Sequence, residues 1–135
     1  MIGLLLVAQA IRPEKTNPPV DENIALHAPA EVMSILKASC YDCHSHETKW
    51  PPYSEIAPLS WSIVAHVNDA RKAMNFSKWE SIDKEIKTKR LKRAIQTVNN
   101  GMMPLPSYLR FHEEAQLSDT QKATIVEWCN QELAK

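Results

Sequence analysis

The feature that most constrains this chain is a five-residue segment, Cys40-Tyr41-Asp42-Cys43-His44, which has the spacing C-x-x-C-H. Two thiols three positions apart can add to the two vinyl groups of one porphyrin, and the imidazole that follows can then bind the iron. A chain of this kind has to build its core around a large, rigid and apolar body. The segment therefore predicts one haem c, attached covalently through Cys40 and Cys43, with His44 as an axial ligand.

The cysteine count limits the other interpretations of this segment. The chain has three cysteines, and an odd number argues against a disulfide framework. Cys129 is left over, and we expect it to be a buried free thiol on the apolar side of a helix. A zinc site needs roughly four protein ligands. His46 and His66 could complete one with the paired thiols, so a structural zinc-binding domain remains an alternative.

The composition favours a single all-α domain. The 135 residues include nine prolines but only two glycines, which is typical of helices joined by proline-rich loops. Lys and Arg together number 16, as do Asp and Glu, so the formal net charge is zero. This balance argues against a nucleic-acid-binding protein.

Hydrophobic spacing and helix start signals predict about four helices. Ser77 and Glu80 form a capping-box pattern, as do Ser118 and Gln121. The expected helices cover residues 30–39, 59–74, 77–99 and 119–133. Three prolines within residues 41–58 predict a loop there, folded over the haem.

The first 28 residues form a separate segment ahead of a haem-binding domain at residues 29–135. Residues 1–11 are apolar apart from Gln9, but a transmembrane helix needs roughly 20 residues. We interpret them as the end of a longer signal peptide or membrane anchor, with a short secretory signal or a packed N-terminal segment as alternatives. The proline-rich stretch that follows is expected to form a tether or an extended arm.

Met103 is the first choice for the sixth ligand of the iron. It lies in the stretch Gly101-Met102-Met103-Pro104, and a thioether is a soft ligand that favours ferrous iron. A lone methionine is usually a core residue, but the surrounding pattern favours ligation here. Met102 is the neighbouring alternative. His66 is an alternative of another kind, which would give bis-histidine ligation and a lower potential.

Aromatic side chains are expected to wall the porphyrin, with ordinary core packing as the alternative for each. These residues are Trp50, Tyr53, Trp61 and Tyr108. We expect the second ring nitrogen of His44 to donate to a carbonyl in the loop at residues 50–58. Arg71 or Asn68 is a candidate partner of the haem propionates.

A basic cluster falls within residues 84–93, where Glu85 is the one acidic residue. Its members are Lys84, Lys87, Lys89, Arg90, Lys92 and Arg93. A solvated helix face is the simpler interpretation. The sharper one is a docking patch for an acidic redox partner, since complementary charge raises encounter rates.

An ordered set of short stretches extends the pattern beyond the haem motif. The stretches are Cys40-Tyr41-Asp42-Cys43-His44-Ser45, Trp50-Pro51 with Tyr53, Ile56-Ala57-Pro58, Asn75-Phe76-Ser77 with Trp79, Gly101 with Met103-Pro104 and Tyr108, and Ala115 with Leu117-Ser118-Asp119 before a helix containing Trp128. Over about residues 29–133, this ordered set resembles the small bacterial haem-binding-domain family of c-type cytochromes. Met102 departs from the family pattern, in which a polar residue stands between the glycine and the methionine.

The resemblance implies a small cytochrome c-like bundle of about four helices around one haem. It also implies export to the periplasm or the outer face of the cytoplasmic membrane, often with an N-terminal membrane tether. Most members of the family have no assigned physiological role. We expect a monohaem electron carrier and not an enzyme, with an unidentified redox protein as partner, no small-molecule substrate and no nucleic acid. A haem-based gas sensor or a haem enzyme with a displaceable sixth ligand is the alternative.

Overall fold

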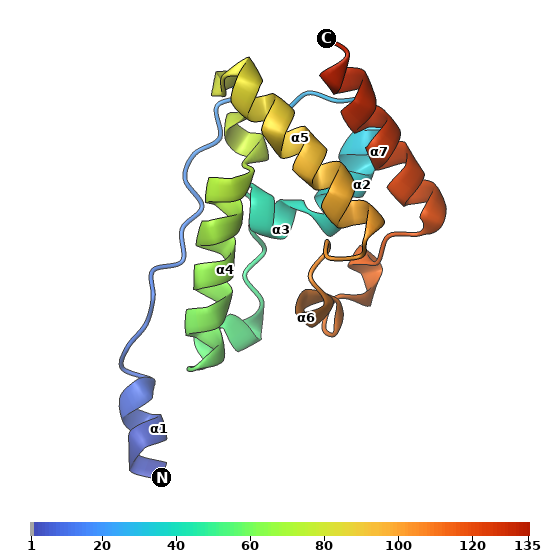
Figure 1. Cartoon of the computed structure of the whole chain (residues 1–135). Helices are drawn as coiled ribbons and strands as arrows, with labels where there is room; N and C mark the ends of the chain where they lie inside the picture. Colours follow the sequence, from blue (N-terminus) through green and yellow to red (C-terminus); the bar gives the residue numbers. More distant parts are fainter. Residues whose placement is uncertain (1) are drawn as a thin grey trace.

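The computed structural model describes residues 2–135, and within this range the chain is helical and has no strand. Seven α-helices follow one another (Figure 1): α1 (Ile2–Ala8), α2 (Ala30–Ser39), α3 (Tyr41–His44), α4 (Leu59–Ala73), α5 (Lys84–Asn99), α6 (Pro106–Leu109) and α7 (Asp119–Leu133). Three short 3-10 helices lie between them: η1 (Pro52–Glu55), η2 (Phe76–Ser81) and η3 (Glu113–Ala115). The all-α prediction is confirmed, and the long helices α2, α4, α5 and α7 correspond to the four that were expected.

The hydrophobic core lies where α2, α5 and α7 meet, with α5 crossing α7 (Figure 1). On α2, Val32, Ile35 and Leu36 recur at helical spacing, and all three are buried. The core residues of α5 and α7 are Leu91, Val98, Ile125, Trp128 and Cys129. Cys129 is a free thiol that is 0% exposed, so the expected small buried hydrophobe is confirmed.

The helix predicted at residues 77–99 is wrong in its first turns, because η2 occupies them and α5 begins later. The Ser77 hydroxyl accepts a hydrogen bond from the backbone N–H of His46 at 2.9 Å. The backbone N–H of Glu80 donates to the Ile24 carbonyl at 2.8 Å. Hydrogen bonds to distant parts of the chain therefore take the place of the capping box.

The start of α7 follows the prediction. The Ser118 side chain accepts from the Gln121 N–H at 3.1 Å, and the Gln121 side chain accepts from the Ser118 N–H at 2.9 Å. Two N–H groups that the helix itself leaves unpaired are satisfied in this way.

An extended arm runs from α1 along the outer side of α4, up to the start of α2 (Figure 1). Arg71 of α4 holds it in place, because its guanidinium donates to the Thr16 carbonyl at 2.9 Å and to the Asn17 side chain at 3.0 Å. Near α1, the Trp61 indole N–H donates to the Ile11 carbonyl at 2.8 Å. The expected extended arm is therefore bound to the surface of the domain.

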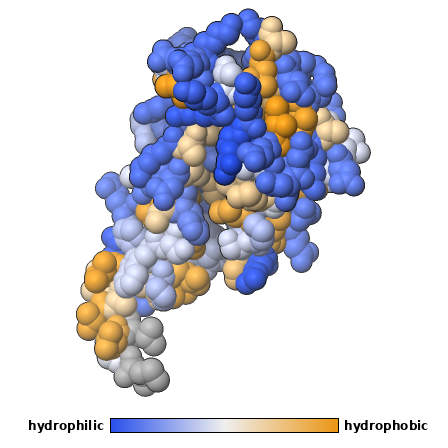
Figure 2. Space-filling model, in the orientation of Figure 1, coloured by the Kyte–Doolittle hydropathy of each residue, from blue (hydrophilic) through white to orange (hydrophobic). Residues whose placement is uncertain are grey.

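Helix α1 forms an apolar end of the molecule (Figure 2). Leu4 is 81% exposed, and Leu6 and Val7 are also largely exposed. Among the described residues, no helix is both long enough and apolar enough to cross a membrane.

Candidate functional site

The C-x-x-C-H segment forms a single helical turn directly after α2. The Cys40 N–H closes α2 by donating to the Leu36 carbonyl at 2.8 Å, and the His44 N–H donates to the Cys40 carbonyl at 2.9 Å. Residues three apart in such a turn lie on one side of it. The expectation of a loop throughout residues 41–58 is corrected, since α3 and η1 both lie within it.

Stacking and hydrogen bonding hold this turn against the core. The Tyr41 ring is buried and stacks on Phe76, with 5.2 Å between centroids and 15° between planes. The Ser45 hydroxyl donates to the Tyr41 carbonyl at 2.7 Å. The motif is therefore presented by a fixed backbone.

One ring nitrogen of His44 is committed to the protein. Its Nδ1 lies 2.9 Å from the Met74 carbonyl and 3.1 Å from the Ala70 carbonyl, both at the C-terminal end of α4. A carbonyl can only accept, so Nδ1 carries the hydrogen and Nε2 carries the lone pair. The expected partner in the loop at residues 50–58 is wrong, because the end of α4 reaches His44 first.

Burial favours the uncharged forms of the motif side chains. It lowers the pKa of His44, against the opposing effect of the two backbone hydrogen bonds. It also raises the pKa of the Cys40 thiol to about 12, with smaller contributions from the Cys43 and Cys129 thiols. It raises the pKa of the Cys43 thiol to about 11, where Asp42 adds to the effect and Arg71 opposes it. The site thus holds two thiols and a neutral imidazole with a free lone pair, the form in which a histidine binds a metal.

A main cavity of about 460 Å³ opens beside the motif. Cys40, Cys43 and His44 line it on one side. Its apolar lining comes from several helices and includes Leu36, Ala70, Ala73, Phe76, Ala94, Val98, Ile125 and Trp128. Elements that lie far apart in the sequence therefore converge on one apolar space next to the motif.

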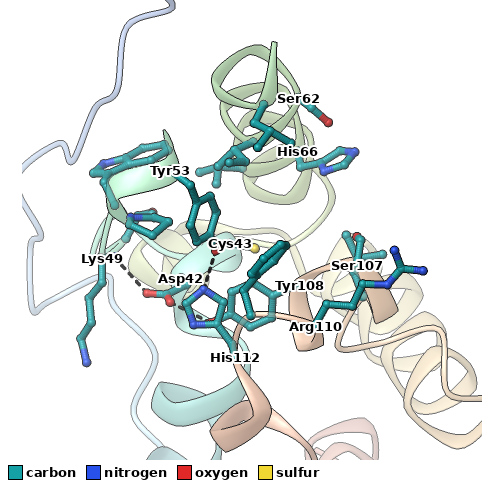
Figure 3. Close-up of a pocket in the computed structure, with 18 residues that line it drawn as sticks. Asp42, Cys43, Lys49, Tyr53, Ser62, His66, Ser107, Tyr108, Arg110 and His112 are labelled. Carbon is teal, nitrogen blue, oxygen red and sulfur yellow. Dashed lines mark hydrogen bonds between the residues drawn. The ribbon is translucent and has the colours of Figure 1, made fainter. Parts of the chain in front are cut away.

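A side cavity of about 390 Å³ adjoins the main cavity. The residues that line both are Cys43, His66, Leu105 and Tyr108. The lining of the side cavity elsewhere includes Trp50 and Phe111. It also includes Tyr53 of η1, and Arg110 and His112 after α6 (Figure 3). The shared lining residues, with Cys43 of the C-x-x-C-H turn among them, show that the two cavities are neighbours.

Two hydrogen-bonded pairs line the side cavity (Figure 3). The Tyr53 hydroxyl lies 2.7 Å from His112 Nε2. Outside the lining, a carboxylate oxygen of Glu114 lies 3.1 Å from His112 Nδ1. The Tyr108 hydroxyl donates to Asp42 at 2.8 Å, and its ring stacks on His112 at 4.2 Å. This hydrogen bond and burial raise the pKa of Tyr108, burial having the larger effect.

The candidates for the sixth ligand all line the main cavity, but they differ in surroundings. Met103 is half-buried, and its N–H donates to the Thr97 carbonyl of α5 at 3.0 Å. Met102 is 49% exposed, and its sulfur accepts from the Asn100 amide at 3.3 Å. His66 is exposed on α4. Met103 is therefore the candidate whose backbone is held by a long helix and whose sulfur has no such amide contact.

The predicted wall residues are placed differently from one another. Trp50, Tyr53 and Tyr108 line the side cavity, and Tyr108 also lines the main one. Trp61 lines neither cavity, which corrects its expected role. It lies on the outer side of α4, where its indole binds the arm.

The two residues proposed for the propionates line neither cavity. Arg71 donates to the Ser45 carbonyl at 2.7 Å and to the Thr48 hydroxyl at 2.9 Å, as well as to the arm. Its donors are therefore used within the protein. Asn68 is exposed on α4.

His112 and Asp42 are the site residues that sequence reasoning missed. His112 lines the side cavity, where its ring stacks on Tyr108 and lies tilted against Tyr53. No sequence pattern joins these positions, because Tyr53 and His112 are 59 residues apart. Asp42 occupies a variable position of the C-x-x-C-H spacing, so its partner could not be inferred.

The donors and the apolar lining of the two cavities fit a haem. Haem is a broad apolar ring with two acidic side chains, and its iron takes an imidazole ligand. The cavity supplies apolar walls, the Nε2 lone pair of His44 and both motif thiols. The buried indole nitrogens of Trp50 and Trp128, one on each cavity, have no hydrogen-bond partner within the protein. These donors suit a ligand that brings its own acceptors.

The described residues do not form the cluster of ligands that the zinc alternative requires. In the part of the chain that the structure describes, His, Cys, Asp and Glu side chains do not gather in groups of three or more that could hold a metal ion. His46, one of the proposed zinc partners, is buried and receives a hydrogen bond from the Asn75 amide at 3.0 Å.

The comparison with family models agrees with this site. The model of the haem-binding domain matches residues 3–131, which is nearly the whole chain and includes the N-terminal arm. Comparison with curated proteins and with solved structures found no significant match. With its motif, its cavity and its family match in agreement, this chain belongs to the haem-binding-domain family.

Proposed function

We propose that this protein is a monohaem c-type cytochrome that transfers single electrons. In this proposal Cys40 and Cys43 would form the two thioether bonds, and His44 and Met103 would bind the iron. The geometry of His44 carries the proposal. Its Nδ1 is fixed by two carbonyls, which leaves Nε2 for a metal in a cavity that both motif thiols line.

The haem would supply an iron centre that gains and loses one electron. The protein's own residues would keep that centre in place. The Met74 and Ala70 carbonyls fix the orientation of the His44 ring and increase its basicity. The largely apolar lining would limit access of water to that centre, and with His44 and Met103 both bound to the iron no position would remain for a substrate.

Redox titration followed in the visible spectrum tests this function. We expect a reversible one-electron transition, the spectrum of a six-coordinate low-spin haem in both states, and slow or absent binding of CO to the ferrous form. Rapid, stoichiometric CO binding would contradict an electron carrier and would favour the gas sensor or the haem enzyme.

The basic face of α5 is our candidate for the docking site of a redox protein. Lys89, Arg90 and Arg93 line the main cavity. Part of the basic cluster is neutralised locally, because Lys87 pairs with Glu80 and Lys89 with Glu85, each at 2.7 Å. Reduction by an anionic donor protein should slow as salt rises. A rate that does not depend on salt would indicate a solvated face only.

We further propose that the protein acts outside the cytoplasm, in the periplasm or on the outer face of the cytoplasmic membrane. Thioether attachment on that side of bacterial membranes and the exposed apolar residues of α1 support this location. Fractionation of cells of the source organism should place the haem-bearing protein outside the cytoplasm, and recovery of it in the cytosol would contradict the assignment.

A further inference from the structure

The indole of Trp50 is the clearest unused donor of the side cavity. Its Nε1 atom is buried, and no acceptor of the protein lies within hydrogen-bond distance. The residue lines the side cavity, just before η1. An indole nitrogen can only donate, and leaving it buried without an acceptor is costly. The holoprotein should therefore provide an acceptor at this position.

The phenols of the side cavity are already paired. The Glu114 carboxylate only accepts, so His112 donates from Nδ1, and the Tyr53 hydroxyl donates to Nε2. The Tyr108 hydroxyl donates to Asp42. These hydroxyls are therefore not free to bind a new acceptor.

Two basic residues, Lys49 and Arg110, line the side cavity, and they differ in how they relate to it. The ammonium group of Lys49 points away from it (Figure 3). Arg110 is exposed and lines the cavity, so it supplies positive charge there. A cavity that holds a buried, unpaired donor and has a cationic residue elsewhere in its lining suits a carboxylate.

The chemistry of the porphyrin says which carboxylate. Its vinyl groups lie on two adjacent pyrroles and its propionates on the other two. A pyrrole joined to one cysteine therefore has the other linked pyrrole on one side and a propionate-bearing pyrrole on the other. Cys43 lines the side cavity and Cys40 does not. A haem joined to both thiols would therefore have a propionate-bearing pyrrole next to the one linked to Cys43, and the side cavity is the space that Cys43, but not Cys40, lines.

Resting on the covalent attachment proposed above, we infer that the side cavity is a propionate pocket. The Trp50 indole N–H donates to the propionate of the pyrrole next to the Cys43-linked one, and Arg110 provides the counter-charge. In this role Trp50 is a positioning residue, and its donor partly neutralises a negative charge close to the iron. Loss of the donor should stabilise ferric over ferrous haem.

The test replaces the indole without removing the aromatic ring. Trp50→Phe is compared with Trp61→Phe, whose indole N–H binds the arm outside both cavities. Redox-difference infrared spectra are recorded on protein carrying haem labelled with carbon-13 at the propionate carboxyls. We expect the labelled carboxylate band to shift and the reduction potential to fall in Trp50→Phe, with both unchanged in Trp61→Phe.

A fully haem-loaded Trp50→Phe variant with an unshifted band would overturn the inference. So would a shift confined to Trp128→Phe, since the unpaired indole of Trp128 lines the main cavity instead. Wild-type protein that carries no covalent haem would contradict the proposed function itself. The intact mass of the wild-type protein, measured by mass spectrometry, detects this outcome separately.

Should Trp50→Phe fail to fold, the wild-type protein answers the same question. In the diamagnetic ferrous state, NMR should show a nuclear Overhauser contact between the Trp50 indole hydrogen and propionate methylene hydrogens. An assigned indole hydrogen without that contact would contradict the propionate pocket.

Discussion

At the scale of the residue, His44 carries the account because its two ring nitrogens have different surroundings. The carbonyls that fix Nδ1 come from residues 26 and 30 positions further along the chain. The motif itself predicted an imidazole ligand, since that chemistry depends only on local spacing. It could not predict the partners of that imidazole, because the Ala70 and Met74 carbonyls reach His44 only through the packing of α4 against the motif.

The two adjacent methionines allow a matched comparison. Met103→Leu removes a sulfur but keeps a similar apolar volume, so the ferric state should lose its sulfur-ligand charge-transfer band and the potential should fall. Ferrous protein should then bind CO. Met102→Leu should change none of these properties, because the Met102 residue is half-exposed and its sulfur accepts a hydrogen bond from Asn100.

The charge-transfer band, the reduction potential and CO binding, measured in both variants, decide whether Met103 or Met102 binds the iron. The opposite pattern, with Met102→Leu as the variant that loses the band, would assign the ligand to Met102. If both variants keep wild-type spectra, Met103 is not the ligand, and His66→Phe becomes the variant to examine.

At the scale of the element, local signals set the long helices and distant contacts set the breaks between them. The apolar spacing of α2 and the capping box of α7 are contained in neighbouring residues, so both could be predicted. The pattern at Ser77 has the same form as that at Ser118. It fails because the Ser77 hydroxyl accepts from His46, which is 31 residues away.

The capping box of α7 gives a measurable stability. Ser118→Ala removes the acceptor of the Gln121 N–H, and loss of such a cap typically costs about 1 kcal/mol of unfolding free energy. Urea unfolding of the haem-loaded protein measures it. Ser34→Ala, on the exposed side of α2, is the control and should stay within about 0.5 kcal/mol. Equal effects in the two variants would show that the cap does not stabilise α7.

At the scale of the whole molecule, Arg71 joins three parts of the chain. Its guanidinium binds the arm at Thr16 and Asn17, the haem-motif loop at Ser45, and Thr48 beyond it. The sequence predicted the arm from its prolines. It could not predict what holds the arm, because these hydrogen bonds span from 23 to 55 residues.

Arg71→Met should therefore release the arm and loosen the motif loop together. We expect a loss on the order of 2 kcal/mol of unfolding free energy, since several hydrogen bonds to a charged group are removed. Hydrogen exchange should quicken at residues 12–20 and at residues 45–48. Lys72→Met is the control, because that side chain is exposed and pairs with Asp69 only at the surface. Unchanged exchange in the arm of Arg71→Met would contradict this clamp.

The covalent state of the two motif thiols tests the central claim most directly. The exported protein is denatured, its intact mass is recorded, and its reactive thiols are counted. We predict the polypeptide mass plus one haem and a single reactive thiol, Cys129, out of the three cysteines of the chain. A polypeptide of unmodified mass with three reactive thiols, obtained from cells competent to attach haem, would contradict the account.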